Sequence, residues 1–310
     1  MDRARLRQHT VEVLTVLAVA ACYYATARLG LLQQLVRGQV TPLWPPTGIA
    51  VAALLVFGVR IWSGIALGAL GVNITIGPAL LPVLIIAAGN TAAPVCSYLL
   101  LRRAGFRDEL DRLRDALALV FLGALAGMLI SATVGTGALV VSGALPAEEF
   151  WRTWSVWWTG DAMGVMVVTP FLLVVRNARL PYRISPARWA EAVALGVCTL
   201  GVTLLATDTS ASLLFLVSPF LIWAAFRFER AGAASCALAV STLAILAAGR
   251  MTGPFAHGLL TNMITLQAFN GTTALTALLL AAVVTERNRT YREIKRLCTQ
   301  LSEKVTRQDL

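Results

Sequence analysis

Long apolar runs alternate with short arginine clusters along almost the whole chain. Several runs are shorter than the roughly 20 residues that a straight membrane-spanning helix needs. The pattern predicts an all-α fold, namely a polytopic transmembrane helix bundle with about ten spans. The ten runs cover residues 11–31, 43–59, 61–77, 79–101, 116–142, 155–175, 189–206, 211–226, 232–249 and 259–284.

Composition and charge agree with a membrane protein. Of the 310 residues, 57% are hydrophobic and only 14% are charged, whereas soluble domains have about a quarter charged residues. The net charge of +10 does not indicate nucleic-acid binding, because the arginines cluster between apolar runs and form no stripe. The five cysteines form no CxxC pair, so neither a disulfide framework nor a metal site is expected, and we expect no cofactor.

The distribution of basic residues predicts the topology. With the N-terminus inside, 22 of the 26 Lys and Arg residues lie on the cytoplasmic side and four lie outside, which satisfies the positive-inside rule. An apolar run that continues beyond a possible cleavage site at Cys22 argues against a signal peptide. We therefore expect a cytoplasmic N-terminus (1–10), a membrane domain (11–284) and a cytoplasmic linker (285–310), with both termini in the cytoplasm.

The stretch Trp154–Gly164 combines three features that are rarely found together. Asp161 is the one acidic residue well inside an apolar run, and such residues usually face a bundle interior or a wet cavity. Trp154, Trp157 and Trp158 share a broad helix face with it, and Gly160 and Gly164 would let a neighbouring helix come close. The stretch is therefore either a ligand or signal site, or an interfacial tryptophan belt with one structurally paired carboxylate.

The second run begins with an unusual helix start. Trp44, Pro45, Pro46, Thr47 and Gly48 precede about 13 helical residues, which cover only about 20 Å of a 30 Å membrane core. The helix should therefore start below the outer surface, unless the motif is a plain interfacial cap. Its free N–H groups would favour an anion, so we predict that Asp161 faces Thr47 and Gly48 in an outward-opening cavity lined by Trp44 and Trp158.

Weaker signals lie elsewhere in the runs. The amide side chains in the runs are each expected to act as interhelical hydrogen-bonding groups; they are Asn73, Asn90, Asn262, Gln267 and Asn270. Glu12 and Glu191 lie 179 positions apart, and Asn90 and Asn270 lie 180 apart. This spacing indicates two parallel four-helix repeats around a central pair of segments, although chance could also produce it.

The polar C-terminal segment predicts a signalling helix. Its apolar residues step by three and four positions; they are Tyr291, Ile294, Cys298, Leu301 and Val305. This is the seam of a coiled coil over about two heptads, and the alternative is a solvated amphipathic tail. No Gly or Pro lies between Thr285 and Thr290, so the last membrane helix should continue into this helix and allow a homodimer.

The motifs together resemble the first type of bacterial membrane-associated sensor (MASE) domain, over about residues 10–285. The resemblance rests on the Trp44-Pro45-Pro46-Thr47-Gly48 motif, the Asn90 helix, the motif Trp157-Trp158-Thr159-Gly160-Asp161 with Gly164, and the segment Pro219–Arg227. It implies a sensory input domain of the inner membrane that precedes a histidine kinase, diguanylate cyclase or phosphodiesterase module. It singles out Trp44, Pro45, Pro46, Gly48, Asn90, Trp157, Trp158, Gly160 and Asp161, and the chain departs from it in having no catalytic module after the membrane domain.

Two functions remain open at this stage. A sensor would pass a signal through its last helix to a cytoplasmic output domain or a partner protein, and its heptad tail fits that role. A small-solute transporter would use Asp161 as a coupling carboxylate, but a proton relay usually has several ionisable groups across the membrane. An enzyme is the weakest option, because no catalytic or metal-ligand constellation is found in the runs.

Overall fold

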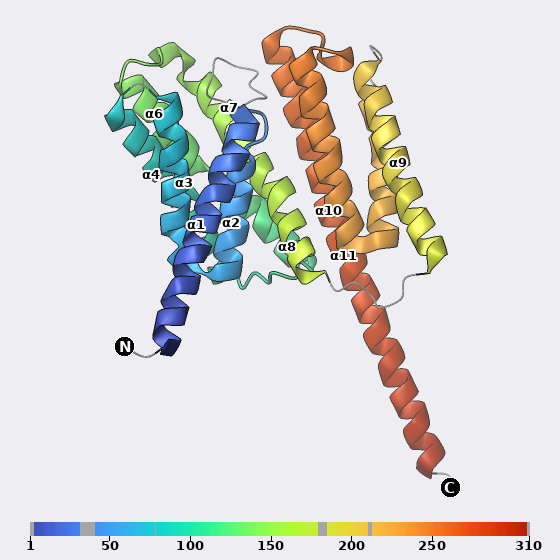
Figure 1. Ribbon diagram of the computed structural model, residues 1–310. Helices are drawn as coiled ribbons and strands as arrows, with labels where there is room; N and C mark the ends of the chain where they lie inside the picture. Colours follow the sequence, from blue (N-terminus) through green and yellow to red (C-terminus); the bar gives the residue numbers. More distant parts are fainter. Residues whose placement is uncertain (1–2, 32–40, 78, 179–184, 210–212, 309–310) are drawn as a thin grey trace.

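The chain folds into a bundle of helices (Figure 1). The computed structural model describes residues 3–31, 41–77, 79–178, 185–209 and 213–308, and within these ranges all regular structure is helical. The first half contains α1 (Arg3–Leu31), α2 (Pro45–Phe57), η1 (Val59–Ile61), α3 (Trp62–Ile76), α4 (Leu80–Arg103), α5 (Leu113–Ala118), η2 (Leu119–Ala126) and α6 (Leu129–Val141). The second half contains η3 (Ala147–Glu149), α7 (Phe150–Met163), η4 (Gly164–Val168), α8 (Thr169–Asn177), α9 (Pro186–Asp208), η5 (Leu214–Val217), α10 (Ser218–Arg250), η6 (Gly253–Phe255) and α11 (Leu259–Gln308).

Eight helices among the described residues are long and apolar enough to cross a membrane. The prediction of an all-α polytopic bundle is confirmed, but the count of about ten differs from eight for two physical reasons. The second run forms only the 13-residue helix α2, as its two prolines predicted. The eighth and ninth runs lie together in the 33-residue helix α10.

Helix α10 consists of two arms that fold back on each other. Glu229 has φ 52° and ψ −137°, which are not helical values. A Cβ atom added to Gly232 would lie 2.8 Å from the carbonyl oxygen of Ala224, whereas a straight helix would separate these residues by about 12 Å. The chain therefore reverses direction at Glu229, between the predicted runs 211–226 and 232–249.

The helical rod α7–η4–α8 separates two groups of helices. The segments α5–η2–α6 and α7–η4–α8 correspond to the fifth and sixth runs, and α7–α8 lies between α2 and the helices α10 and α11 (Figure 1). In the two outer groups, the glutamates of the predicted repeat form equivalent ion pairs. Arg60 lies 3.4 Å from Glu12, and Arg227 lies 2.6 Å from Glu191. These contacts support the repeat, which stays a prediction.

The outer surface of the bundle is apolar where lipid would contact it. Leu14 on α1 is 60% exposed and Val197 on α9 is 64% exposed. Exposed apolar surface on this scale is unusual in water and matches a membrane-embedded helix, so the lipid bilayer is the partner of this surface.

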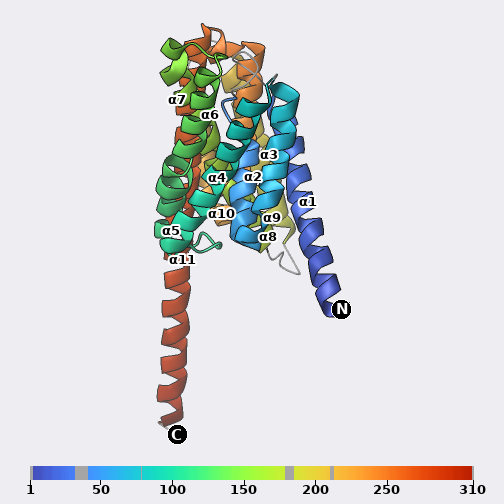
Figure 2. The ribbon, with the colours of Figure 1, turned by 90° about the vertical axis from the view of Figure 1, so that its left-hand side faces the viewer.

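Both ends of the described chain lie at the same end of the bundle, and α11 extends well beyond it (Figures 1 and 2). As predicted, the last apolar run and the polar tail form one continuous helix of 50 residues. The part after Val284 would reach about 35 Å at 1.5 Å per residue. The tail is thus a rigid extension of a helix that packs inside the bundle.

Candidate functional site

Asp161 lies in the interior of the bundle and accepts hydrogen bonds from two neutral hydroxyl groups. Its side chain is 2% exposed. Thr47 Oγ1 donates to one carboxylate oxygen at 2.7 Å, and Ser131 Oγ donates to the other at 2.5 Å. The predicted contact between the second and sixth runs is therefore confirmed. The predicted donors were wrong, because hydroxyl groups rather than the backbone N–H groups of α2 hold the carboxylate.

Glycines make this contact possible by letting backbones touch. A Cβ atom on Gly164 would lie 2.1 Å from the carbonyl oxygen of Trp44, and one on Gly48 would lie 2.1 Å from the carbonyl oxygen of Gly164. A Cβ on Gly160 would lie 2.4 Å from the oxygen of Thr41, and the Trp44 N–H donates to the Gly160 oxygen at 3.0 Å. The predicted close-packing role of Gly160 and Gly164 is confirmed, and their neighbour is the segment 41–48.

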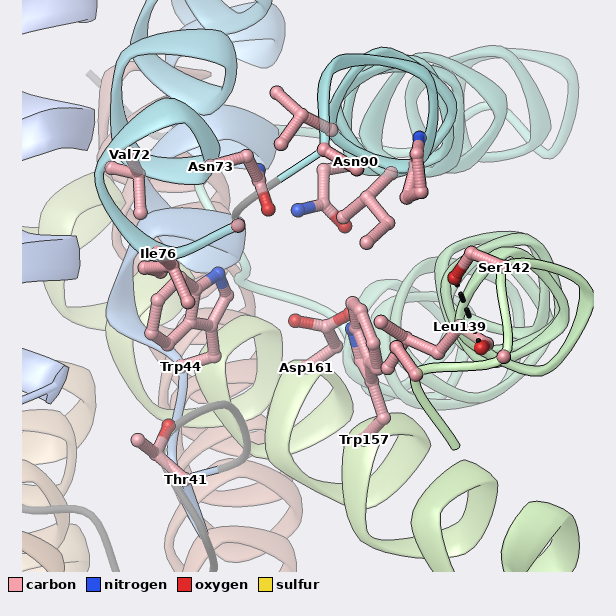
Figure 3. Close-up of a pocket in the computed structure, with 17 residues that line it drawn as sticks. Thr41, Trp44, Val72, Asn73, Ile76, Asn90, Leu139, Ser142, Trp157 and Asp161 are labelled. Atoms are coloured by element: carbon pink, nitrogen blue, oxygen red, sulfur yellow. Dashed lines mark hydrogen bonds between the residues drawn. The ribbon is translucent and has the colours of Figure 1, made fainter. Parts of the chain in front are cut away.

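A cavity of about 320 Å³ opens beside Asp161, at the end of the bundle opposite the termini (Figures 1 and 3). Its wall is formed by α3, α4, α6, α7, the loops between α3 and α4 and between α6 and α7, and the segment 41–44 before α2. The lining residues are Thr41, Trp44, Val72, Asn73, Ile76, Gly77, Ala79, Pro82, Val83, Ile86, Asn90, Leu139, Ser142, Gly143, Ala144, Trp157 and Asp161. The walls are largely apolar with a few polar groups, as in small-molecule sites generally.

The tryptophans that line the cavity are not the two that were predicted. Trp44 and Trp157 line the cavity on either side of the Asp161 carboxylate (Figure 3), whereas Trp158 does not. The indole N–H of Trp158 instead donates to the carbonyl oxygen of Leu125 at 2.8 Å, and its ring stacks on Trp154 with centroids 5.6 Å apart. Trp158 therefore packs against the fifth segment, which corrects its predicted place in the cavity wall.

Among the other predicted residues, Asn90 lines the cavity. The predicted residues that are not in its lining are Pro45, Pro46, Thr47, Gly48 and Gly160. Asn73, expected to act only between helices, also faces the cavity (Figure 3). Ser131 was not predicted. The sequence does not show whether a serine in an apolar run donates its hydrogen bond to a buried carboxylate or to another helix. Among the described residues, no cluster of His, Cys, Asp or Glu could hold a metal ion.

Two π-helical segments flank the site. The segment η4 directly follows Asp161 and Met163, and η2 includes Leu125, which accepts the Trp158 hydrogen bond. Thr169 Oγ1, just after η4, donates to the Gly48 carbonyl oxygen at 2.9 Å. Such π-helical turns often occur at functional sites, and η4 lies against α2 at the point where α7 continues into α8.

The last membrane helix contacts α7 close to the cavity. The Gln267 amide on α11 donates a hydrogen bond to Thr159 Oγ1, two residues before Asp161. One turn further along α11, a Cβ on Gly271 would lie 3.8 Å from the Met163 side chain. The helix that carries the C-terminal tail is thus bonded to the helix that carries the buried carboxylate.

Where α11 leaves the bundle, ionic contacts surround it; we call this set the exit collar. Arg289 pairs with Asp111, and the Glu286 carboxylate accepts a hydrogen bond from the Leu113 N–H at 2.9 Å. The Glu229 carboxylate, at the reversal of α10, accepts from Asn288 at 3.0 Å and from Arg292 at 2.9 Å. The collar thus joins α11 both to the loop before α5 and to α10.

A second acidic residue of the same loop is largely buried. Asp108 forms ion pairs with Arg102 at 3.4 Å and Arg176 at 3.5 Å. Burial raises the pKa of the Asp108 carboxyl above its ordinary value, although the two arginines lower it.

Beyond the collar, the predicted seam residues are exposed. Tyr291, Ile294 and Leu301 are 71%, 54% and 62% exposed, and Cys298 is exposed as well. The Val305 side chain lies outside the described residues. A row of exposed apolar side chains on a projecting helix is a surface that a second helix could cover.

One comparison with known proteins identifies a family. The MASE1 family model matches residues 14–288. No curated protein and no solved structure matches the chain.

Proposed function

The chain belongs to the MASE1 family of integral membrane sensor domains, and we propose that it detects its stimulus in the cavity beside Asp161 and transmits it through α11 to a cytoplasmic output module. MASE1 is a non-catalytic sensory domain. The output module is expected to be of the histidine kinase, diguanylate cyclase or phosphodiesterase type. The membrane is proposed to be the bacterial inner membrane, with both termini cytoplasmic.

The observation that carries this proposal is the hydrogen bond between Gln267 and Thr159. A ligand that displaces Trp157 or Asp161 would rotate or shift α7 by a fraction of a turn. Because Thr159 lies on the same helix turn, the shift would act directly on α11. Rigid helices that pack against each other transmit small displacements over long distances.

The exit collar and the exposed seam provide the later steps of the proposal. The collar would hold α11 in one register against the bundle, and a shift of α11 would rearrange its ion pairs. The exposed seam would pair with the seam of a second copy, so that a homodimer presents two output modules to each other. Dimerisation through a short coiled coil is sensitive to small helix rotations.

The charge distribution supports the orientation. The two ends of the chain lie at one end of the bundle (Figure 1), and 22 of the 26 basic residues are assigned to that side. Under the positive-inside rule this end faces the cytoplasm, which would place the cavity on the outer side, where an external stimulus could reach it.

A transporter is the alternative function. Asp161 next to the short helix α2 resembles the discontinuous helices of transporters. The family membership favours the sensor, and solute transport does not require the projecting end of α11 after Val284.

A cavity-filling variant tests the proposal. A diguanylate cyclase would be fused after Leu310, and Leu139→Trp would fill part of the cavity, because Leu139 lines it and is 6% exposed. The matched control is Leu129→Trp on the same helix, where Leu129 is 42% exposed and outside the cavity wall. We expect Leu139→Trp to change cyclase output by at least about fivefold, and Leu129→Trp to leave it within about twofold.

Adding Gln267→Leu to the cyclase fusion tests how the signal passes from α7 to α11. If the signal passes through the Gln267–Thr159 contact, the effect of Leu139→Trp should largely disappear in this background, which a double-mutant cycle measures. An equal effect of Leu139→Trp with and without Gln267→Leu would contradict transmission through this contact. No effect of Leu139→Trp in either background would contradict the sensory role of the cavity.

A further inference from the structure

The cavity wall carries a carboxyl group that no cationic side chain among the described residues balances. Among the described residues that line it, Asp161 is the only ionisable side chain. Among the described residues, none of the ion pairs includes Asp161. Its hydrogen-bonding partners, the hydroxyl groups of Thr47 and Ser131 and the indole N–H of Trp157, are all neutral. A buried carboxylate is normally paired with a cation, so a site that leaves it unpaired is complementary to a positively charged ligand.

The carboxylate still has acceptor capacity on the cavity side. The two carboxylate oxygens can together accept about four hydrogen bonds, and Thr47, Ser131 and the Trp157 indole supply three of them. In Figure 3 the carboxylate points into the space between Trp44 and Trp157. An N–H group or a quaternary nitrogen in that space would therefore meet the charge directly.

The rest of the wall also fits an organic cation. Trp44 and Trp157 bring two indole rings to the cavity, and the face of an indole ring attracts a cation. The Asn73 amide nitrogen is already bonded to the Ala69 oxygen at 2.8 Å, which leaves its oxygen as an acceptor. Asn90 forms no hydrogen bond with a described residue and points into the same space (Figure 3).

Other ligand classes fit less well. An anion would be repelled by Asp161, and a neutral apolar molecule would leave the carboxylate unpaired. A hard metal ion prefers about six or more oxygen ligands, which one carboxylate among mainly apolar side chains does not supply. The volume of about 320 Å³ is near the lower end of the range of about 300–1,000 Å³ for ligand sites, so the ligand is small.

We propose that the cavity beside Asp161 binds a small organic ammonium compound, with its nitrogen between Trp44 and Trp157 and its charge paired with the Asp161 carboxylate. This inference rests on the proposed sensory function and gives the chemical class of its stimulus. The class follows from one unpaired carboxylate, two aromatic walls and a compact apolar chamber.

Matched probes test the charge requirement on the unmodified protein. The full chain in lipid nanodiscs would be titrated with tetramethylammonium, choline and n-butylammonium, and with 3,3-dimethylbutan-1-ol, which has the shape of choline without its charge. Isothermal titration calorimetry and tryptophan fluorescence would report binding. We expect at least one cation to bind saturably, and choline to bind at least about tenfold more tightly than its neutral isostere, as a desolvated cation–π and ion-pair contact predicts.

Variants then locate the site. Asp161→Asn should weaken binding of the cation by at least about tenfold, because an amide keeps the shape but loses the charge. Glu148→Gln is the control, since Glu148 is exposed in η3 at the same end of the bundle and lies outside the cavity wall, and it should leave affinity within about twofold. Thermal unfolding of each variant would show whether it is folded.

Different results of these experiments would contradict the cation proposal and the proposed sensory function. Equal affinity for choline and its neutral isostere would overturn the assignment of a cationic ligand, and so would unchanged affinity for the cation in folded Asp161→Asn. Neither result would exclude a ligand of another class, whose sensory effect the cyclase fusion tests independently. Absence of saturable binding by all three cations would also overturn it. A cation that binds but does not change cyclase output would contradict the sensory role alone.

Discussion

Asp161 at the cavity and Asp111 in the exit collar are both acidic residues of a mostly apolar chain, but their partners differ. Asp161 is held by two neutral hydroxyl groups deep in the bundle. Asp111 pairs with Arg289, whose side chain is 46% exposed. The first arrangement keeps an acceptor available for a ligand that enters the cavity, whereas in the second a carboxylate that is 12% exposed pairs with a half-exposed arginine and joins two parts of the protein.

The two contacts also differ in their free energy and in how strongly salt screens them. A buried hydrogen bond to a charged group is worth about 1.5–3 kcal/mol, and salt hardly screens it. A partly exposed ion pair is worth about 0–1 kcal/mol and weakens as salt increases. The hydrogen bonds around Asp161 therefore keep the cavity wall in a fixed geometry, whereas the weaker ion pairs of the exit collar can rearrange when α11 moves.

The largest effect is expected at the backbone contact that supports the cavity. Gly164→Ala would place a Cβ atom 2.1 Å from the Trp44 oxygen, so η4 and the segment 41–48 would have to separate. We expect a loss of about 1–3 kcal/mol of unfolding free energy and loss of the Thr47–Asp161 contact. Denaturant unfolding in detergent would measure it.

Gly137→Ala provides the control for this steric effect. A Cβ at Gly137 meets nothing within 4 Å, and replacing a helical glycine by alanine usually stabilises by about 0.5–1 kcal/mol. Similar losses for the two variants would show that the close approach at Gly164 does not support the cavity.

The second effect concerns the hydroxyl groups around Asp161. Ser131→Ala should cost about 1–3 kcal/mol, because it leaves a buried charged acceptor without one of its donors. The cost should be smaller in an Asp161→Asn background, where no charge needs the donor, and unfolding of both single variants and the double variant measures this coupling.

Ser142→Ala is the matched control, because Ser142 also lines the cavity but bonds only the Leu139 carbonyl oxygen. Equal costs for Ser131→Ala in both backgrounds would mean that the serine does not act through the carboxylate.

The third effect lies in the exit collar and should depend on salt. Arg289→Gln removes the partner of Asp111 and should cost no more than about 1 kcal/mol at low ionic strength. The difference from the unmodified protein should vanish near 1 M salt, where the Debye length is about 3 Å, whereas the cost of Ser131→Ala should persist. Arg296→Gln, beyond the collar on α11, serves as control, and a salt-independent loss in Arg289→Gln would contradict the comparison.

The smallest effect is a pH dependence at Asp108. Because burial raises the pKa of its carboxyl in the folded protein, the folded state binds the proton more tightly than the unfolded state. The stability that Asp108 contributes is therefore greatest below about pH 4, the ordinary range for this group, and decreases as the pH rises through the folded pKa.

Asp108→Asn should consequently be at least as stable as the unmodified protein at pH 7, and this advantage should disappear on acidification. Thermal unfolding across this pH range measures it, with Glu109→Gln as control because Glu109 is 54% exposed. A larger advantage for Asp108→Asn at low pH than at pH 7 would contradict the sign of the shift.

Several features of the site followed from local sequence. Two prolines at the start of a short apolar run predicted the short helix α2, and the spacing of Gly160 and Gly164 predicted a close approach. The absence of Gly and Pro after Thr285 predicted the continuous helix α11. Each of these inferences depends on neighbours within a few residues, which is the range that sequence patterns describe.

The cavity wall could not be predicted in the same way. Trp157 and Trp158 are adjacent, so they point about 100° apart on a helix with 3.6 residues per turn. Which of them faces the cavity depends on the rotation of α7, and the contacts of Gly160 and Gly164 with the segment 41–48 set that rotation. The sequence showed that a tryptophan would be near Asp161 without showing which one.

The sequence by itself determined that this chain is an all-α membrane protein with a buried carboxylate and a projecting C-terminal helix, because hydrophobic runs, prolines and glycines act locally. Only the tertiary structure decided that Ser131, 30 residues before Asp161 in the chain, completes the site, and that Gln267 joins α11 to α7. Such contacts depend on how rigid helices rotate and cross, and backbone atoms that meet at glycines determine those angles.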